Sequence, residues 1–338
     1  MAGDIPNKAL VIGIDDYGGS GRDLKGCVAD AKAVADRLKT HWDGEPNCEV
    51  ITLTSDTRDV TTDVMDDHMR RLFRGEANTV VFYFAGHGML DAETNQGYLV
   101  SKDHSRATPG LLLSTIIDMA NDASPNIRST VIILDSCHAG FVGEVSAIRN
   151  QKLALIGKGV TVLTAADRDQ EATEFDGHGL FTGILLDGLD GSAADVLGRI
   201  TPAALYSLVD QTLGGYEQRP VYKANVQRFI TLRKVEPRVS PAQLRKIKDY
   251  FPSASHIFPV DPSFQEDRGQ FTKEFRHIPV VAENAKVFKD MQAYYKVNLV
   301  APVGHPFPWD AAMHSTGFRL TAQGAHYRQL ALRDRIFV

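Results

Sequence analysis

Short apolar runs alternate with stretches of helical periodicity along the first two-thirds of the chain. Nearly every position is apolar at 8–14 and at 79–85. Strands that are apolar on both faces are typical of a parallel sheet that helices cover on both sides. We therefore predict a doubly wound α/β unit with right-handed crossovers. The other strands are expected at 49–54, 129–134 and 160–164, and the helices at 24–38, 60–73, 111–120 and 180–189.

Two further helix starts are marked by capping residues. Thr201 and Pro202 supply an N-cap and a proline at the first helical position. Ser240 begins a second helix with capping-box spacing. The stretches 218–221 and 229–232 lie between these helices and are expected to form edge structure.

A polar stretch at 234–239 that contains Pro237 predicts a domain boundary. The two predicted domains are 1–235, the catalytic domain of the argument below, and 236–338. The second domain has 14 Lys+Arg against 10 Asp+Glu, and so carries a net charge of +4. The chain as a whole carries −5, so the first domain is acidic.

The pattern of the second domain predicts a small α+β fold. Val287, Met291 and Tyr294 recur at helical spacing. A short strand is expected at 318–320, followed by Thr321 as the N-cap of a last helix. Helix, short strand, turn, strand and helix together give a winged-helix-like outline.

Composition narrows the class of protein. The 338 residues include 43% hydrophobic and 23% charged residues, as in ordinary globular proteins. No run approaches the roughly 18 apolar residues of a membrane span, and no secretory signal is recognised. Three cysteines are too few for a disulfide scaffold, so we expect a cytoplasmic protein. The acidic balance gives no footprint for nucleic acid, which makes it an unlikely partner.

Two predicted strands end in turns that carry reactive side chains. The strand at 79–85 continues into Gly86, His87 and Gly88, and the strand at 129–134 continues into a turn that contains Cys137. Ligands of open parallel sheets bind beyond the carboxyl ends of the strands. If the two strands are neighbours, their ends lie about 5 Å apart. His87 and Cys137 would then face one crevice.

This pair suits nucleophilic catalysis. A histidine close to a thiol can take its proton, the thiolate attacks a carbonyl, and the imidazolium protonates the leaving amine. Backbone N–H groups of Gly88 and Cys137 are the predicted oxyanion hole. No third side chain is required if backbone contacts orient the imidazole. His138 and His178 are rival bases; we interpret His178 as a loop residue ahead of a helix.

The motifs FYFAGHG and IILDSCHAG resemble the His and Cys motifs of caspase-like cysteine proteases of the peptidase C14 family. The separation of 50 residues between His87 and Cys137 matches the caspase pattern. Further similar motifs follow at 13–17, 24–31, 97–99 and 179–182, so that the resemblance covers about residues 7–232. It implies a caspase-hemoglobinase fold with a mostly parallel central sheet, and it implies a Cys137–His87 dyad.

Departures from animal caspases point to the metacaspases. In metacaspases the Asp two residues before the nucleophile and an Asp in the first helix line an acidic S1 pocket. Asp135 and Asp30 stand at those places, with Cys27 nearby, whereas Leu24 stands where animal caspases have an arginine that holds a substrate aspartate. Two carboxylates favour a cationic guest. The resemblance therefore implies cleavage after Arg or Lys.

Some metacaspases need calcium, which clustered acids bind. Five acidic residues after the fifth strand are candidates, but we favour a solvated acidic loop over a calcium site. No metal or other cofactor is expected to be required for the chemistry. The candidates are Asp167, Asp169, Glu171, Glu174 and Asp176.

Bacterial caspase-like proteases resemble this chain in carrying an extra domain that senses or recruits. The resemblance implies a regulated effector, in antiviral defence or cell suicide, that the C-terminal domain controls. Aromatic and basic residues there are candidate contacts for a nucleotide-type signal or a protein partner. These candidates are Tyr294, Tyr295, Trp309, Arg319, His326 and Arg328.

Two alternatives to a protease stay open at this stage. One is a pseudoprotease that serves as a binding scaffold. The other is a winged-helix regulator that binds DNA, although a net charge of +4 on residues 236–338 is thin support for it.

Overall fold

The computed structural model divides into two compact units. The first comprises Met1–Asp195 and Arg199–Val235, and the second comprises Val196–Gly198 and Glu236–Val338. The structure describes residues 5–19, 21–91, 93–94, 96–136, 156–165, 174–175, 178–213 and 220–337.

A six-stranded sheet forms the centre of the first unit, in the order β12-β8-β7-β3-β1-β2. Its strands run parallel except β12, which pairs antiparallel with β8 at one edge. The strands are β1 (Asn7–Gly13), β2 (Cys48–Thr54), β3 (Ala77–Ala85), β7 (Ile127–Asp135), β8 (Val160–Thr164) and β12 (Val221–Ala224).

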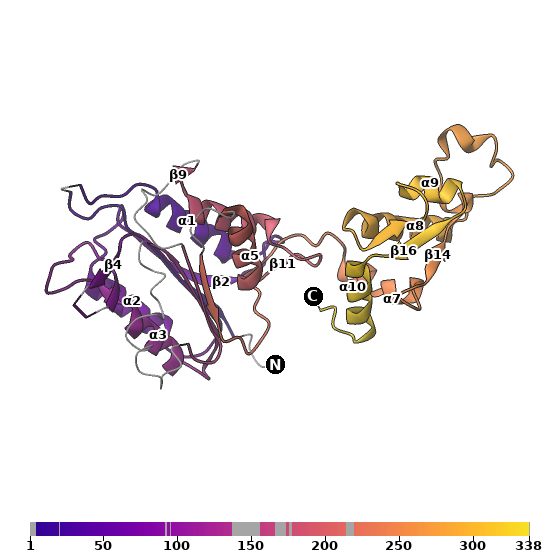
Figure 1. Ribbon diagram of the computed structural model, residues 1–338. Helices are drawn as coiled ribbons and strands as arrows, with labels where there is room; N and C mark the ends of the chain where they lie inside the picture. Colours follow the sequence, from indigo (N-terminus) through magenta and orange to yellow (C-terminus); the bar gives the residue numbers. More distant parts are fainter. Residues whose placement is uncertain are drawn as a thin grey trace. The chain divides into compact units, whose positions relative to one another are not determined.

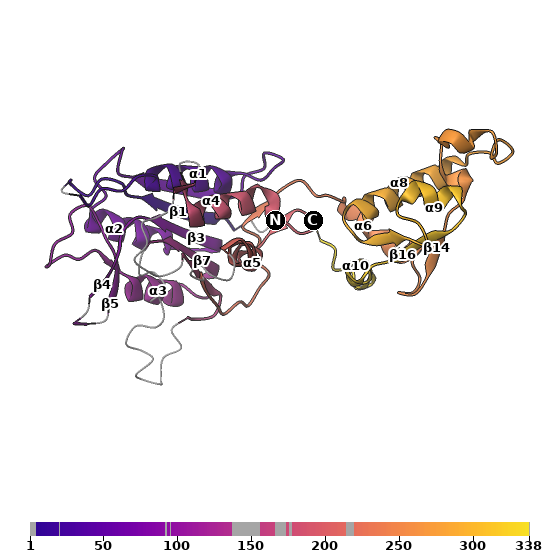
Figure 2. The same cartoon turned by 45° about the horizontal axis from the view of Figure 1, so that its top comes forward.

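Helices cover both faces of this sheet (Figures 1 and 2). One face carries α2 and α3 over a core that includes Phe82 and Phe84, and the other carries α1, α4 and α5 over a core that includes Tyr83. Because successive β3 side chains point to opposite faces, an unbroken apolar run serves both cores. The helices are α1 (Cys27–Lys39), α2 (Thr62–Leu72), α3 (Leu113–Asp122), α4 (Leu180–Asp187) and α5 (Pro202–Leu213).

The predicted α/β architecture is therefore confirmed, with every predicted central strand present. One edge prediction is half right, because Val221 begins β12 whereas 229–232 forms no strand. Ile230 and Leu232 instead pack into the core beneath α4 and α5.

Small antiparallel sheets that the sequence analysis missed flank the main sheet. One connects β3 to α3 in the order β4-β5-β6, one joins β9 and β10, and one joins β11 and β13. Each is too short to show a periodic pattern. The strands are β4 (Gly88–Asp91), β5 (Gln96–Leu99), β6 (Leu111–Leu112), β9 (Glu174–Phe175), β10 (His178–Gly179), β11 (Arg199–Ile200) and β13 (Arg233–Lys234), and a short π-helical turn, η2 (Gly188–Ser192), follows α4.

The second unit has its own core around a three-stranded antiparallel sheet in the order β14-β16-β15. Its strands are β14 (Ile257–Pro259), β15 (Val300–Pro302) and β16 (Gly317–Leu320). Its helices are α6 (Pro241–Arg245), α7 (Ile247–Tyr250), α8 (Ala282–Lys296), α9 (Pro308–Met313) and α10 (Ala322–Leu332), with 3₁₀ turns η3 (Pro262–Phe264) and η4 (Gly269–Thr272).

The predicted elements of this unit are present. The Ser240 hydroxyl accepts a hydrogen bond from the N–H of Gln243 at 3.1 Å, and the Thr321 hydroxyl accepts one from Gly324 at 3.0 Å, so both predicted N-caps are confirmed. The short helix α9 lies between β15 and β16, where the winged-helix-like outline has only a turn. The domain type stays a prediction.

Gly324 of α10 packs against the main chain of Leu299, the residue directly before β15. A Cβ at Gly324 would lie 1.8 Å from the Leu299 carbonyl oxygen. We expect Gly324→Ala to destabilise the second unit by about 3 kcal/mol or more, because packed backbone cannot yield. Gly183→Ala in α4 is the matched control, since its Cβ would meet nothing within 4 Å. Because alanine has a higher helix propensity than glycine, we expect Gly183→Ala to raise the free energy of unfolding by about 1 kcal/mol. Urea unfolding of both variants tests the pair, and equal losses would contradict it.

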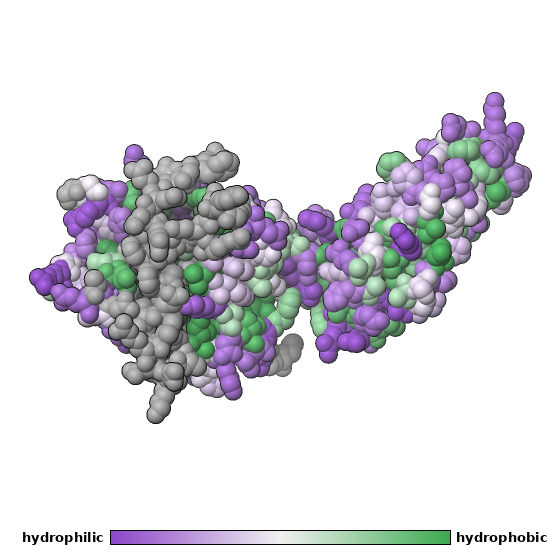
Figure 3. All heavy atoms as spheres, in the orientation of Figure 1, coloured by the Kyte–Doolittle hydropathy of each residue, from purple (hydrophilic) through white to green (hydrophobic). Residues whose placement is uncertain are grey.

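Hydrophilic residues cover most of the described surface on the face drawn in Figure 3, with smaller hydrophobic areas between them. Among the described helices, none combines the length and the apolar character needed to cross a bilayer.

Candidate active site

The two strands that carry the predicted dyad are neighbours in the central sheet. β3 pairs with β7 so that Ala85 lies opposite Asp135, and the N–H of Gly86 donates to the Asp135 carbonyl at 3.2 Å. His87 follows β3 by two residues and Cys137 follows β7 by two residues. The predicted adjacency of the strand ends is confirmed, while Cys137 itself lies outside the described residues.

The His87 imidazole is oriented by a main-chain carbonyl. Its Nε2 lies 2.7 Å from the carbonyl oxygen of Arg22. A carbonyl can only accept, so Nε2 carries the hydrogen of this bond. Nδ1 is then the nitrogen that can take a proton from another group. The sequence analysis expected backbone orientation of this kind, but it had no means of identifying Arg22 as the acceptor.

Tyr17 contacts His87 through a hydrogen bond and through its ring. The Tyr17 hydroxyl accepts a hydrogen bond from the N–H of His87 at 2.8 Å, and the two rings lie 4.7 Å apart. Tyr17 is 1% exposed, and burial raises the pKa of its phenol. A Cβ at Gly86 would lie 2.5 Å from the Tyr17 oxygen, so only glycine allows this approach. Gly88, the predicted oxyanion donor, begins β4 and is half-buried.

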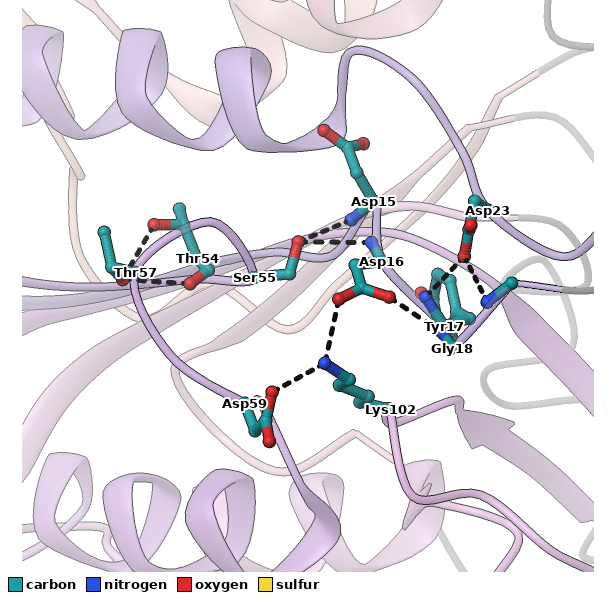
Figure 4. A network of polar contacts seen from close by, with 11 residues as sticks. Asp15, Asp16, Tyr17, Gly18, Asp23, Thr54, Ser55, Thr57, Asp59 and Lys102 are labelled. Atoms are coloured by element: carbon teal, nitrogen blue, oxygen red, sulfur yellow. Dashed lines mark hydrogen bonds and ion pairs between the residues drawn. The ribbon is translucent and has the colours of Figure 1, made fainter.

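The loop that carries the Arg22 carbonyl is shaped by its own polar contacts (Figure 4). One oxygen of Asp23 accepts from the N–H groups of Tyr17 and Gly19, at 2.8 and 3.2 Å. Ser55 Oγ accepts from the N–H of Asp15 at 2.9 Å. These contacts fix the backbone before Arg22, and with it the direction of the carbonyl.

Lys102 fastens the same loop to its surroundings (Figure 4). Its ammonium group lies 2.8 Å from Asp16 and 2.6 Å from Asp59. All three side chains reach solvent, so these ion pairs add little to stability. Their use is geometric, because they join the segments that follow β1, β2 and β5.

The two predicted pocket carboxylates face one point beside this loop. Asp30 lies in the first turn of α1 and is 2% exposed, and Asp135 is the last residue of β7. A Cβ at Gly179 would lie 3.2 Å from Oδ2 of Asp135 and 3.4 Å from Oδ2 of Asp30. The structure thus brings Asp30 and Asp135 together at the start of α4.

Asp135 is held by a chain of hydroxyl groups. Thr182 Oγ1 donates to Oδ2 of Asp135 at 2.6 Å, and Thr182 in turn lies 2.6 Å from the Tyr83 hydroxyl. Burial raises the pKa of Asp135 to about 6, the Thr182 hydrogen bond opposes the rise, and the Asp30 charge adds to it. Asp135 therefore loses its charge at a much higher pH than an ordinary carboxyl group.

Cys27 lies beside the same carboxylates as the first residue of α1. Burial raises the pKa of its thiol far above the ordinary range, with Asp15, Asp135 and Asp30 adding to the effect. Cys27 is therefore a neutral thiol that lines the site beside the two carboxylates, and it is not a nucleophile. Asp15 caps α1 here, because its carboxylate accepts from the N–H groups of Cys27 and Val28 at 2.9 and 3.2 Å.

His178 is the pocket residue whose role the sequence analysis misjudged. The sequence predicts a loop residue, whereas His178 forms β10 with Gly179 and its Nδ1 lies 2.5 Å from Oδ1 of Asp30. Its place in a Gly-His-Gly motif directly before a helix was the only signal in the sequence. The motif alone could not show that the imidazole turns towards α1.

Two of the six candidate ligand contacts in the second unit are buried and bonded within that unit. Tyr294 is buried and its hydroxyl donates to the Gln243 carbonyl at 2.5 Å. The Arg328 guanidinium is buried and donates to the carbonyls of Phe251 and Pro252. Both side chains are used inside the unit.

The other four candidates reach the surface to different degrees. Tyr295 and Trp309 are half-buried and donate to main-chain carbonyls of their own unit, at 3.1 and 2.8 Å. Arg319 and His326 are exposed. These four stay predictions.

The acidic residues considered for calcium lie outside the described residues of the structure, apart from the backbone of Glu174. Within the part of the chain that the structure describes, no group of three or more His, Cys, Asp or Glu side chains is placed to hold a metal ion.

Comparison with known proteins gives a family match across the first unit. The family model of the caspase domain of peptidase C14 matches residues 6–230. The chain is 28% identical over 164 residues to Metacaspase-1 of Scheffersomyces stipitis, covering 43% of this chain and 38% of that protein. It is 30% identical over 148 residues to Metacaspase-1 of Mycosarcoma maydis, covering 39% and 35%. The chain thus matches less than two-fifths of the length of these relatives.

Solved structures show weaker likeness. Caspase-1 from Spodoptera frugiperda has a TM-score of 0.49 at 12% identity, covering 69% of this chain and 91% of that one. A protein from Geobacter sulfurreducens has a TM-score of 0.49 at 16% identity, covering 69% and 98%.

Proposed function

Because this chain belongs to the caspase-domain family of cysteine peptidases, we propose that it is an endopeptidase that cleaves after Arg or Lys through a Cys137–His87 dyad. The observation that carries the proposal is the bond from His87 Nε2 to the Arg22 carbonyl at the end of β3. It leaves Nδ1 as the basic nitrogen, on a residue that follows β3, whose end is paired with the end of β7 from which Cys137 follows.

The proposed reaction uses both nitrogens of His87. Nδ1 takes the thiol proton of Cys137, and the thiolate attacks the scissile carbonyl. The imidazolium keeps donating Nε2–H to the Arg22 carbonyl, which stabilises the positive charge. N–H groups of Gly88 and Cys137 bind the oxyanion, and Nδ1–H then protonates the leaving amine. Water hydrolyses the remaining thioester by the same route.

The acidic pair supports the specificity for a cationic P1 side chain. Asp30 and Asp135 point to one spot, and Thr182 Oγ1 holds the Asp135 carboxylate there. A guanidinium or ammonium group fits two carboxylates better than an apolar or acidic side chain does. A cleavage profile of purified protein on a peptide library tests this specificity; a preference for Asp at P1 would refute it.

Tyr17 is expected to act as a positioning residue for His87. Tyr17→Phe removes the acceptor of the His87 N–H and leaves a buried donor unpaired, which costs about 1–3 kcal/mol. We expect kcat to fall several-fold while KM for an Arg peptide stays constant, because the Tyr17 hydroxyl bonds to the main chain of His87. Steady-state kinetics and urea unfolding test both effects. Tyr98→Phe is the matched control, since Tyr98 is half-buried and its hydroxyl donates to the Gln96 side chain.

We propose that residues 236–338 sense or recruit, and thereby control the peptidase as an effector in antiviral defence or cell suicide. Their support is a separate core and sheet, which the chemistry of the first unit does not need. Two experiments test this proposal. One measures peptide cleavage by the full chain with and without cyclic nucleotides. The other measures the growth of cells that express the wild type or Cys137→Ala. Equal growth under viral challenge in both strains would refute the effector role.

A further inference from the structure

A histidine stands at the acidic pair without a part in the proposed dyad. His178 Nδ1 lies 2.5 Å from Oδ1 of Asp30, and the N–H of Gly179 donates to Oδ2 of the same carboxylate at 3.2 Å. Both oxygens of Asp30 therefore have a donor from β10. Thr182, three residues after Gly179, donates a hydrogen bond to Asp135. The segment 178–182 therefore contacts both carboxylates.

Asp30 depends on these donors because its surroundings disfavour its charge. Its side chain is 3% exposed, whereas the His178 ring is 31% exposed. The described titratable groups that face Asp30 are His178 from β10, Asp135 from β7, Tyr83 from β3, Asp15 from the loop after β1 and Cys27 from its own helix. Two of the five are acids and two are neutral. His178 is the one group among them that offers an N–H to the carboxylate.

We propose that His178 is a specificity-determining residue, whose Nδ1–H keeps the Asp30 carboxylate ionised and oriented for the cationic P1 side chain. The inference rests on the proposed Arg/Lys specificity and deepens it. His178 acts on the substrate through Asp30, which makes it a positioning residue. Asp30 without this donor is a buried acid that has lost a stabilising N–H, and such a group takes up a proton at a higher pH than an ordinary carboxyl group.

The direction of the effect follows from the opposing contributions. Burial raises the pKa of Asp30, and the contacts with His178 and Gly179 hold the rise down. Loss of the His178 donor raises this pKa further, so the carboxylate becomes neutral at a higher pH. Affinity for a cation, which needs the charge, then disappears at a higher pH as well.

Two substitutions separate the donor from the ring. His178→Asn keeps an N–H near the place of Nδ1 and loses the ring, whereas His178→Phe keeps a flat ring and loses the donor. Both are made in the Cys137→Ala background, so that titration of the dyad does not enter. The probe is benzamidine, a small amidinium compound, whose dissociation constant is measured by calorimetry from pH 5 to 8.5.

We expect His178→Asn to bind benzamidine within about threefold of the Cys137→Ala parent. We expect His178→Phe to bind about tenfold more weakly at pH 7, with the midpoint of its pH dependence moved upward by about one pH unit. If the ring only packs against α1, the order is reversed, with His178→Phe normal and His178→Asn weak, and the inference is overturned. Equal binding by all three proteins overturns it as well, while the proposed specificity stands.

Failure of the proposed function looks different from failure of this inference. A Cys137→Ala parent that binds no benzamidine at any pH, together with a wild type that shows no preference for Arg or Lys at P1, overturns both. The Asp30→Asn variant provides the reference for a pocket that lacks this charge, and we expect it to bind as weakly as His178→Phe at pH 7.

Discussion

Replacement of Cys137 or His87 by alanine is expected to abolish cleavage of Arg and Lys peptides, with kcat/KM falling by about a thousandfold or more. In the proposed mechanism the thiolate is the nucleophile and the imidazole both generates it and protonates the leaving amine, so the two losses share one cause. The double variant should therefore be no worse than either single variant. Steady-state kinetics on a fluorogenic Arg peptide measures all three.

Matched controls distinguish the dyad from ordinary loss of a cysteine or histidine. Cys48→Ala should keep full activity, because burial raises the pKa of the Cys48 thiol to about 12 and Cys48 begins β2, at the opposite end of the sheet from Ala85 and Asp135. His138→Ala tests the rival base next to the nucleophile and should also stay active. An inactive His138→Ala with an active His87→Ala would reverse the assignment of the base.

A chemical probe without an S1 group provides a second readout of the dyad. Iodoacetamide alkylates thiolates, so His87→Ala should slow modification of Cys137 at pH 7. A scaffold that only binds peptides predicts no such dependence on His87. The same experiment therefore decides between the peptidase and the pseudoprotease that the sequence left open.

Hydrophobic patterning predicted the central sheet because burial on both faces leaves an unbroken apolar run. The predicted site required the two strands to be neighbours, and the observed register of β3 against β7 brings the turns after Ala85 and Asp135 together. Strands of two to four residues, such as β4 and β10, carry too few positions for a period to appear. The sequence was silent about them for that reason.

The orienting groups of the site were hidden for a different reason. The acceptor for His87 is the main chain of Arg22, and any residue type has a carbonyl. Tyr17 contributes a hydroxyl, but nothing in the sequence around this tyrosine indicates that its hydroxyl accepts from His87. His178 contacts Asp30, which lies 148 residues away in the sequence. Such contacts depend on where loops end in space, which residue types and short spacings do not encode.

In the second unit aromatic and basic residue types suggested ligands, but two of them serve the fold. The Tyr294 hydroxyl and the Arg328 guanidinium satisfy carbonyls at Gln243, Phe251 and Pro252. Burial of a polar side chain requires such partners. A residue type that can bind phosphate can equally close the end of a helix, and only burial tells the two uses apart.

Asp135→Asn is expected to lower kcat/KM for Arg peptides by about a hundredfold, because the variant keeps the shape of the side chain and loses the charge opposite the guanidinium. Cleavage of a peptide with a neutral P1 side chain should change by less than about threefold. The ratio of the two rates isolates the pocket, since the dyad contributes equally to both. Asp187→Asn, at the exposed end of α4, is the control and should leave the ratio unchanged.

The pH dependence of that ratio carries a sign that the structure fixes. Burial raises the pKa of Asp135 to about 6, so its carboxylate is charged above that pH and neutral below it. In the wild type the preference for Arg should therefore fall as the pH decreases through 6. In Asp135→Asn the ratio should keep no step at this pH, and a step of unchanged size in the variant would assign it to another group.

Stability should move in the opposite direction to activity. The pKa of Asp135 rises from its ordinary 3.8 to about 6 on folding, so between these values the folded chain holds a proton that the unfolded chain has lost. Stability therefore decreases as the pH rises through this window, and by pH 7 the buried charge costs up to about 3 kcal/mol. Asp135→Asn removes that cost, so it should unfold at a higher urea concentration than the wild type at pH 7 while cleaving Arg peptides more slowly. A variant that lost both stability and activity would show instead that Asp135 holds the fold, and the assignment of its carboxylate to the substrate would fall.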